Sequence, residues 1–183
     1  MSEPRLQKFY NDKVAPQLMK DFSLTNKLAA PRLQKVTINV GLGKSLTDPK
    51  LVEIATNTLT RISGQKPVVR KAKKSISNFK IKQGMVIGLQ VTLRGRRMYE
   101  FLDKLFHVTL ARVRDFRGIK DTNLDGRGNI TIGFKEHIVF PEIRNDEVES
   151  VHGLEVTITT SAENNDQGRK LFQLLGLPFA KKE

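Results

Sequence analysis

Apolar and polar residues alternate along several short stretches of the chain. In residues 33–40 (LQKVTINV), Val36, Ile38 and Val40 fall on one face and polar residues on the other, which predicts a strand with one solvent-facing side. Residues 85–93 show a similar alternation and predict a second such strand. Further strands are predicted at residues 67–70, 130–134 and 154–160.

Apolar residues at helical spacing mark four other stretches. The first, residues 4–20, contains Pro16, which lacks a backbone N–H and should kink or split the helix. The second starts at Thr47 or Asp48, whose short side chain suits a helix N-terminus, and ends at Gly64. The remaining helices are predicted over residues 98–110 and about 162–175.

The order of these elements predicts an α+β fold. Helix, strand, helix, strand, strand and helix precede a long turn-rich segment, and strand, strand and helix follow it. The middle six elements resemble a split β-α-β unit, in which helices cover one face of a mainly antiparallel sheet. The other face would carry polar side chains such as Asn39, Gln90 and Thr92. We expect one domain over residues 1–183, with an extended region over residues 111–147 that forms a long projecting loop.

Length and composition exclude several classes of protein. A chain of 183 residues buries a core without metal or disulfide staples, and the absence of cysteine excludes disulfides, thiolate zinc sites and cysteine nucleophiles. No apolar run reaches the roughly 18 residues of a membrane span, and the first residues do not resemble a signal peptide. These observations predict a folded, cytoplasmic protein with no membrane partner.

Positive charge is concentrated in one part of the chain. Lys and Arg total 32 against 19 Asp and Glu, a net charge of +13. Residues 54–99 contain eleven Lys or Arg and no acid, so the rest of the chain is nearly neutral. Closely spaced positive charges repel one another, and a folded protein tolerates them best when a polyanion neutralises them. As that polyanion, nucleic acid is favoured over an anionic membrane surface. The alternative is a solvated basic face that only aids solubility.

The basic connection between two predicted strands, residues 71–84 (KAKKSISNFKIKQG), is suited to RNA. Its lysines can neutralise phosphates with release of counterions, and its hydroxyl and amide groups can bond to sugars or base edges. Phe79 could stack on an unpaired base. With Ile76 and Ile81 nearby, however, packing of Phe79 in the core beneath the connection is the favoured interpretation.

The sequence GLGKS at residues 41–45 resembles a phosphate-binding loop only superficially. A P-loop requires glycine where Ile38 stands, and a dinucleotide fingerprint requires glycine where Leu46 stands. A close backbone approach and a plain turn after the strand remain equally open for Gly41 and Gly43.

No residue pattern supports catalysis or a metal site. His107, His137 and His152 lack metal-ligand spacing, and no acid pair or nucleophile–base set stands out. We therefore expect no cofactor, no metal and no enzymatic activity. Residues 114–129 mix charges with a lone Phe116, a composition that fits either a protein contact or an ordinary long loop.

Several strings of residues resemble one family over essentially the whole chain. They are INVGLG (38–43), GQKP (64–67), AKKSISNFKI (72–81), RVRDFRGI (112–119), DGRGN (125–129), FPEI (140–143) and GLPF (176–179). Together they closely resemble the bacterial-type ribosomal protein L-five family of the large subunit.

This resemblance implies a structural role in the ribosome. Members of that family bind 5S rRNA and help attach it in the central protuberance. They also contact 23S rRNA, P-site tRNA and neighbouring large-subunit proteins, and they bridge to small-subunit ribosomal protein thirteen. By resemblance, Asn39, Gln65 and Thr92 meet 5S rRNA, residues 72–80 reach toward ribosomal RNA and the tRNA, and the region from RDFRG to FPEI faces the small subunit. We do not expect homo-oligomers.

Charge, alternation and resemblance together nominate two sets of residues. The predicted RNA-binding residues are Asn39, Gly41, Gly43, Lys44, Gln65, Lys66, Arg70, Lys71, Lys73, Lys74, Ser75, Ser77, Asn78, Lys80, Lys82, Gln90, Thr92 and Arg94. The predicted subunit-bridge residues are Arg112, Arg114, Asp115, Phe116, Arg117, Glu142 and Arg144. Departures from the family pattern at His137, Val139 and His152 bear only on the bridge side.

Three other functions are compatible with a basic chain. A general nucleic-acid-binding or architectural protein outside the ribosome would bind duplex DNA about as well as folded RNA. An enzyme acting on nucleic acid would cleave it with a divalent metal. A membrane-surface protein would float with anionic vesicles.

Overall fold

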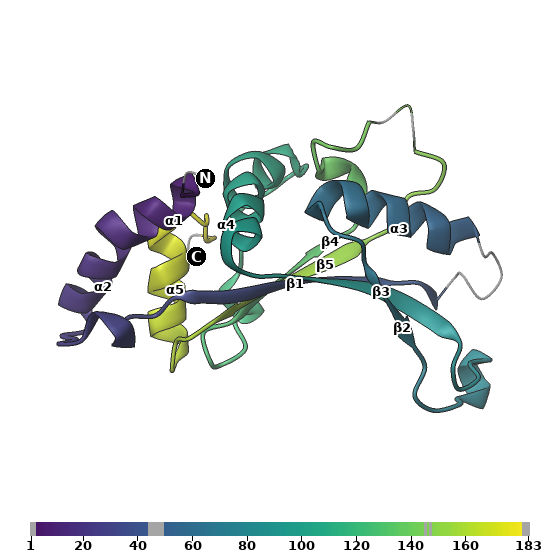
Figure 1. Ribbon diagram of the computed structural model, residues 1–183, viewed down its shortest axis with the longest axis horizontal. Helices are drawn as coiled ribbons and strands as arrows, with labels where there is room; N and C mark the ends of the chain where they lie inside the picture. The colour runs from purple at the N-terminus through teal and green to yellow at the C-terminus, as the bar shows by residue number, and fades with distance from the viewer. Residues whose placement is uncertain (1–2, 44–49, 145, 147, 181–183) are drawn as a thin grey trace. The chain divides into compact units, whose positions relative to one another are not determined.

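The computed structural model describes residues 3–43, 50–144, 146 and 148–180, and its strands form one five-stranded sheet (Figure 1). The strands are β1 (Leu33–Gly41), β2 (Val68–Lys71), β3 (Val86–Leu93), β4 (Ile130–Phe134) and β5 (Leu154–Thr160), in the order β2-β3-β1-β5-β4. β2 and β3 are antiparallel, with Val68 opposite Gln90 and Arg70 opposite Gly88. The α+β fold with an antiparallel sheet is therefore confirmed.

The helices fall close to the predicted ranges. They are α1 (Arg5–Phe9), α2 (Ala15–Asp21), α3 (Lys50–Ser63), α4 (Gly95–Lys104) and α5 (Asn165–Leu174). α4 begins before the predicted start at Met98. α5 begins after residue 162, because the side chain of Asn164 accepts a hydrogen bond from the backbone N–H of Gln167 and caps the helix there. The predicted start of α3 at Thr47 or Asp48 lies outside the described residues.

Pro16 splits the first predicted helix, as expected. A π-helical turn (Tyr10–Val14) separates α1 from α2, and the backbone N–H of Ala15 donates to the carbonyl oxygen of Tyr10, five residues earlier. In a regular helix the proline ring would clash with the carbonyl four residues before it. The wider turn just before Pro16 relieves that clash.

The described chain divides into two compact units, each built from segments that are distant in the sequence. The first unit comprises residues 1–36, 93–132 and 157–183, and the second comprises residues 37–92 and 133–156. Our expectation of a single RNA-binding domain therefore stays a prediction.

The first unit is built around its helices. α1 packs against α4, and the guanidinium of Arg5 pairs with the carboxylate of Asp103. Leu18, Leu102 and Phe172, from α2, α4 and α5, are fully buried. These helices therefore share one apolar core.

In the second unit, α3 lies over one face of β1 and β3 (Figure 1). Ile38, Val40, Leu89 and Val91 from these strands are fully buried, as is Leu59 from α3. None of the described helices of this unit covers the opposite face of the strands. That uncovered face is where polar side chains were expected.

Part of the segment 114–129, which we expected to project, is hydrogen-bonded to other residues of the first unit. The backbone N–H of Ile119 donates to the carbonyl of Pro178 and the N–H of Ala180 donates to the carbonyl of Ile119, at 2.9 and 3.0 Å. Ile119 is only 4% exposed, and Asn123 Nδ2 donates to the carbonyl of Thr131. A short parallel pairing with the C-terminal segment thus holds the loop against the first unit.

Candidate nucleic-acid interface

The face of the second unit's strands opposite α3 carries polar side chains. Asn39 on β1 is exposed, and Thr37, Gln90 and Thr92 on β1 and β3 are half-buried, while the residues between them are buried. We call this side the open face. Its residues are those that the sequence alternation predicted, so the alternation is confirmed.

The open face also carries an acid that sequence reasoning overlooked. Glu155 on β5 is exposed between the buried Leu154 and Val156, so it points to the side opposite the core. The same alternation in residues 154–160 could have revealed it. The open face is therefore polar rather than uniformly basic.

Arg70 reaches across the open face from β2. Its Nε donates a hydrogen bond to Oε1 of Gln90, the polar residue of β3. Both side chains lie on the same face, since Arg70 is opposite Gly88 and Gln90 is two residues further along β3. The structure thus joins two of the predicted RNA-binding residues directly.

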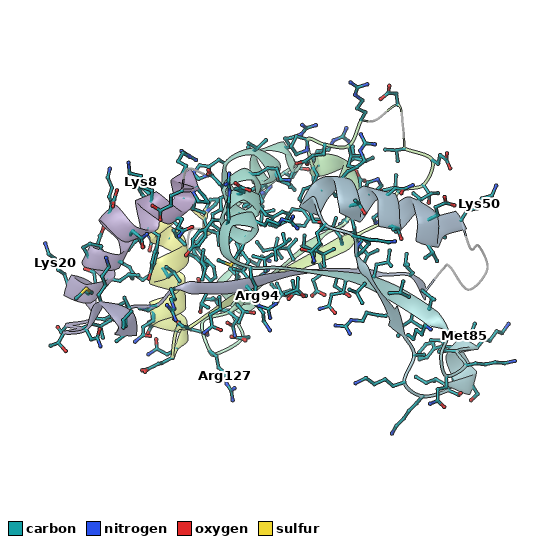
Figure 2. The ribbon with its side chains drawn as sticks, in the orientation of Figure 1. Lys8, Lys20, Lys50, Met85, Arg94 and Arg127 are labelled. Carbon is teal, nitrogen blue, oxygen red and sulfur yellow. The ribbon has the colours of Figure 1, made fainter. Side chains whose placement is uncertain are left out.

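β2 and β3 continue into the basic connection, residues 71–84, which extends away from the rest of the second unit (Figure 1). Backbone hydrogen bonds hold its two arms together. Ala72 N–H donates to the carbonyl of Met85 at 2.8 Å, and Ile76 and Ile81 exchange bonds of 2.8 and 3.1 Å. The side chains around Met85 radiate outward (Figure 2). The connection is therefore an ordered hairpin.

The charged residues of the basic connection are all exposed. They are Lys71, Lys73, Lys74, Lys80 and Lys82. Within the described parts of the chain, no ion pair neutralises them. Ser77 and Asn78 are also exposed, whereas the hydroxyl oxygen of Ser75 accepts a hydrogen bond from the N–H of Gln83 and so helps to hold the hairpin. The connection offers five uncompensated cations to an anionic partner.

The expectation that Phe79 packs in the core is wrong. Phe79 is 68% exposed and Ile76 is 46% exposed. The connection is a two-stranded hairpin beyond the layered part of the unit, so it has no second layer that could bury an aromatic ring. A one-turn helix (Ser77–Phe79), closed by Lys80 N–H on the carbonyl of Ser77, presents the ring to solvent. Phe79 is a candidate site residue that the list of predicted RNA-binding residues did not include.

Other predicted RNA-binding residues are more scattered. Gln65 and Lys66 follow α3, half-buried and exposed respectively. Gly41 and Gly43 are exposed, and a plain turn and a close backbone approach stay equally open for both. Lys44 lies outside the described residues. Arg94 precedes α4 and belongs to the first unit.

The predicted subunit-bridge residues are divided between the units. Arg112, Arg114, Asp115, Phe116 and Arg117 belong to the first unit, and Glu142 and Arg144 belong to the second. The five in the first unit are exposed apart from the half-buried Phe116. In the second unit, Nη2 of Arg61 donates to the backbone carbonyl of Glu142 at 2.8 Å. The structure therefore does not show these residues as one site.

Two features of the described residues bear on other functions. No group of three His, Asp or Glu side chains in the described ranges is arranged to hold a metal ion. None of the helices there is long and apolar enough to span a membrane.

Comparison with known proteins decides the family. Residues 26–82 match the family described as "Ribosomal protein L5", and residues 86–179 match the model that describes the C-terminus of the same ribosomal family. The chain belongs to the ribosomal protein L5 family. The boundary between the two L5 matches lies at the end of the basic connection, so it does not follow the division into two compact units.

Curated L5 proteins resemble the chain over nearly its full length. Large ribosomal subunit protein uL5 of Halothermothrix orenii is 54% identical over 170 residues, 93% of this chain and 95% of that protein. The uL5 proteins of Geotalea daltonii and Cupriavidus metallidurans are 50% and 51% identical over 175 residues, 96% of this chain and 98% and 97% of those proteins.

Proposed function

We propose that this L5 protein is a non-catalytic component of the large ribosomal subunit that binds 5S rRNA through its second unit. The relatives are named as large-subunit proteins of bacteria, which places this family member in the ribosome and hence in the cytoplasm. Membership of a structural ribosomal family also means that the chain is not an enzyme.

One structural observation supports the 5S rRNA assignment. The open face and the basic connection belong to the same unit and are continuous through β2 and β3. Polar groups such as Asn39 and Thr92 can bond to base edges and ribose hydroxyls, which gives selectivity. The lysines of the connection neutralise phosphates, which gives affinity that depends on salt. One ligand that meets both surfaces would be a folded RNA.

The further partners are proposals of the same kind. The exposed Phe79 and the lysines of the basic connection suit an RNA with unpaired bases, such as the P-site tRNA, because aromatic rings stack on bases that lack partners. The exposed Arg112 and Arg114 suit the bridge to small-subunit protein thirteen, and 23S rRNA and the central protuberance follow from the family resemblance.

Binding titrations at several salt concentrations test the proposal, with 5S rRNA, tRNA and duplex DNA as ligands. We expect 5S rRNA to bind most tightly. Asn39→Ala should weaken 5S rRNA binding without changing the slope of log K against log salt, since it removes no charge. Lys73→Ala should lower that slope by about 0.7 to 0.9, the value for one phosphate contact.

Two outcomes would contradict the proposal. Equal affinities and equal salt slopes for all three ligands would indicate a general basic nucleic-acid-binding protein instead. If Asn39→Ala weakened binding of every ligand to the same extent, the open face would not be the selective surface.

A further inference from the structure

The contact between Arg70 and Gln90 depends on the residue that lies between them. Directly opposite Arg70 on β3 is Gly88, which has no side chain. The diagonal neighbour, Gln90, is within reach of a long side chain in an antiparallel pair. Arg70 can therefore cross the open face at Gly88 and donate from Nε to Oε1 of Gln90.

Packing against β1 keeps position 88 free of a side chain. A Cβ on Gly88 would lie 2.8 Å from the carbonyl oxygen of Val40, closer than real Cβ atoms come to backbone. The space that Arg70 crosses is thus set by the spacing of β1 and β3. It does not depend on the conformation of a flexible side chain.

The contact changes what the two side chains offer to a ligand. Gln90 uses its amide oxygen to accept from Arg70, so the group it has left to offer is the NH2 donor. Arg70 keeps the four N–H groups of Nη1 and Nη2, and its side chain is exposed. The pair therefore presents N–H donors to a ligand. The hydrogen bond from Nε of Arg70 to Gln90 fixes the orientation of the guanidinium plane.

We propose that Gln90 is a positioning residue that orients Arg70 to bind a pair of acceptor atoms on RNA. The inference rests on the proposed RNA-binding function and adds the chemistry of one contact. A planar fork of two N–H groups matches two oxygens of a phosphate, or N7 and O6 on the Hoogsteen edge of a guanine. Both ligands are acceptor pairs, and the experiment separates them.

A double-mutant cycle measured as affinity for 5S rRNA tests the role of Gln90. Arg70→Ala should lower affinity about tenfold and reduce the salt slope. Gln90→Met, which removes the acceptor, should lower affinity about threefold to tenfold and leave the slope unchanged. In the Arg70→Ala background, Gln90→Met should have no further effect, since there is no guanidinium left to orient.

The variant Gln90→Glu separates positioning from direct contact. Glutamate keeps an acceptor for Nε of Arg70 and loses the NH2 group. Glutamate also adds a carboxylate that repels phosphates, so all affinities are compared at high salt, where that repulsion is screened. If Gln90 acts through Arg70, Gln90→Glu then binds within about threefold of the wild type and better than Gln90→Met. Gln90→Glu binding as weakly as Gln90→Met, or Gln90→Met weakening the Arg70→Ala protein as much as the wild type, would overturn the proposal.

Modified 5S rRNA identifies the acceptor pair. If the pair is on guanine, 7-deazaguanosine weakens binding of the wild type but not of Arg70→Ala. If the acceptor pair is on a phosphate of the RNA backbone, methylphosphonate at individual positions weakens binding of the wild type but not of Arg70→Ala. If neither modification separates the wild type from Arg70→Ala, the proposal fails.

Two controls distinguish failure of the Gln90 inference from failure of the proposed 5S rRNA binding. Lys8→Ala removes one exposed charge from α1 in the first unit and should leave binding unchanged (Figure 2). Thermal unfolding should show that every variant is folded. If the wild type shows no preference for 5S rRNA, the proposed function fails. If that preference stands and Arg70 and Gln90 act additively, only this inference fails.

Discussion

His137 and His152 stack ring against ring in the second unit, with their centroids 4.2 Å apart and their planes inclined by 13°. Nδ1 of His137 lies 3.2 Å from the backbone oxygen of His152 and 3.3 Å from its backbone nitrogen. Burial lowers the pKa of both rings from 6.5, and the neighbouring His137 lowers the pKa of His152 further. The stack therefore favours the neutral form of both imidazoles.

The stack predicts that the protein loses stability in mild acid. With a folded pKa below the unfolded value of 6.5, each ring takes up its proton more readily in the unfolded chain. Its contribution to stability is full above about pH 6.5 and is lost as the pH falls. Each ring contributes a slope of at most about 1.4 kcal/mol per pH unit. Urea unfolding between pH 5 and pH 7.5 measures the slope.

Two variants locate that pH dependence. His137→Phe should flatten the fall in unfolding free energy below pH 6.5, because one of the two protonations is removed. His107→Gln removes an imidazole from the exposed surface of the first unit and serves as the control. A protein whose acid sensitivity survives His137→Phe and disappears with His107→Gln would contradict the assignment.

Phe79→Ala should weaken RNA binding without loss of stability. The ring is 68% exposed, so its removal leaves no cavity. Stacking on a base is worth about 1–3 kcal/mol, which corresponds to a loss of roughly 5- to 160-fold in affinity. Titration with tRNA and 5S rRNA measures it, and Phe79→Tyr, which keeps an aromatic face, should bind nearly as the wild type does. An unchanged affinity for both RNAs would mean that Phe79 does not stack.

Gly88→Ala should destabilise the second unit by about 1–3 kcal/mol. The new Cβ would meet the carbonyl oxygen of Val40 at 2.8 Å, and backbone cannot move aside cheaply. Gly133→Ala on β4 is a matched control, because a Cβ there has no neighbour within 4 Å. Thermal or urea unfolding of both variants checks this. Equal stabilities would show that β1 and β3 can spread apart at this point.

Glu155→Gln should strengthen RNA binding. Its exposed carboxylate lies on the open face and repels phosphates. We expect a gain of about twofold to fivefold at low salt that fades as salt screens the repulsion. Glu163→Gln removes an exposed acid from the first unit and should leave affinity unchanged. A gain of the same size for Glu163→Gln would indicate a long-range charge effect instead.

The parts of the fold that depend on local pattern were predictable from the sequence. The strand at residues 154–160 has its predicted bounds. The alternation of apolar and polar residues that predicts it can be read from neighbouring positions in the sequence. Burial of Phe79 was mispredicted, since the sequence around it does not reveal whether a second layer lies beneath the hairpin. The pairing of Ile119 with Pro178 is not predictable from local pattern, because the two residues are far apart in the chain.

The candidate site was predictable only in part for the same reason. The polar side of β1 and β3 follows from alternation, and the lysines of the connection follow from charge. The contact between Arg70 and Gln90 was not predictable, because it depends on the register of β2 against β3 and on the glycine between them.

The interleaving of the two units sets an order in which they can fold during synthesis. The last segment of the second unit ends at residue 156, whereas the first unit also needs residues 157–183, which include α5. A growing chain can therefore complete its second unit before α5, the last helix of the first unit, has been made. The open face and the basic connection can thus be complete on a protein that is still being made, and α5 is the last helix to join the first unit.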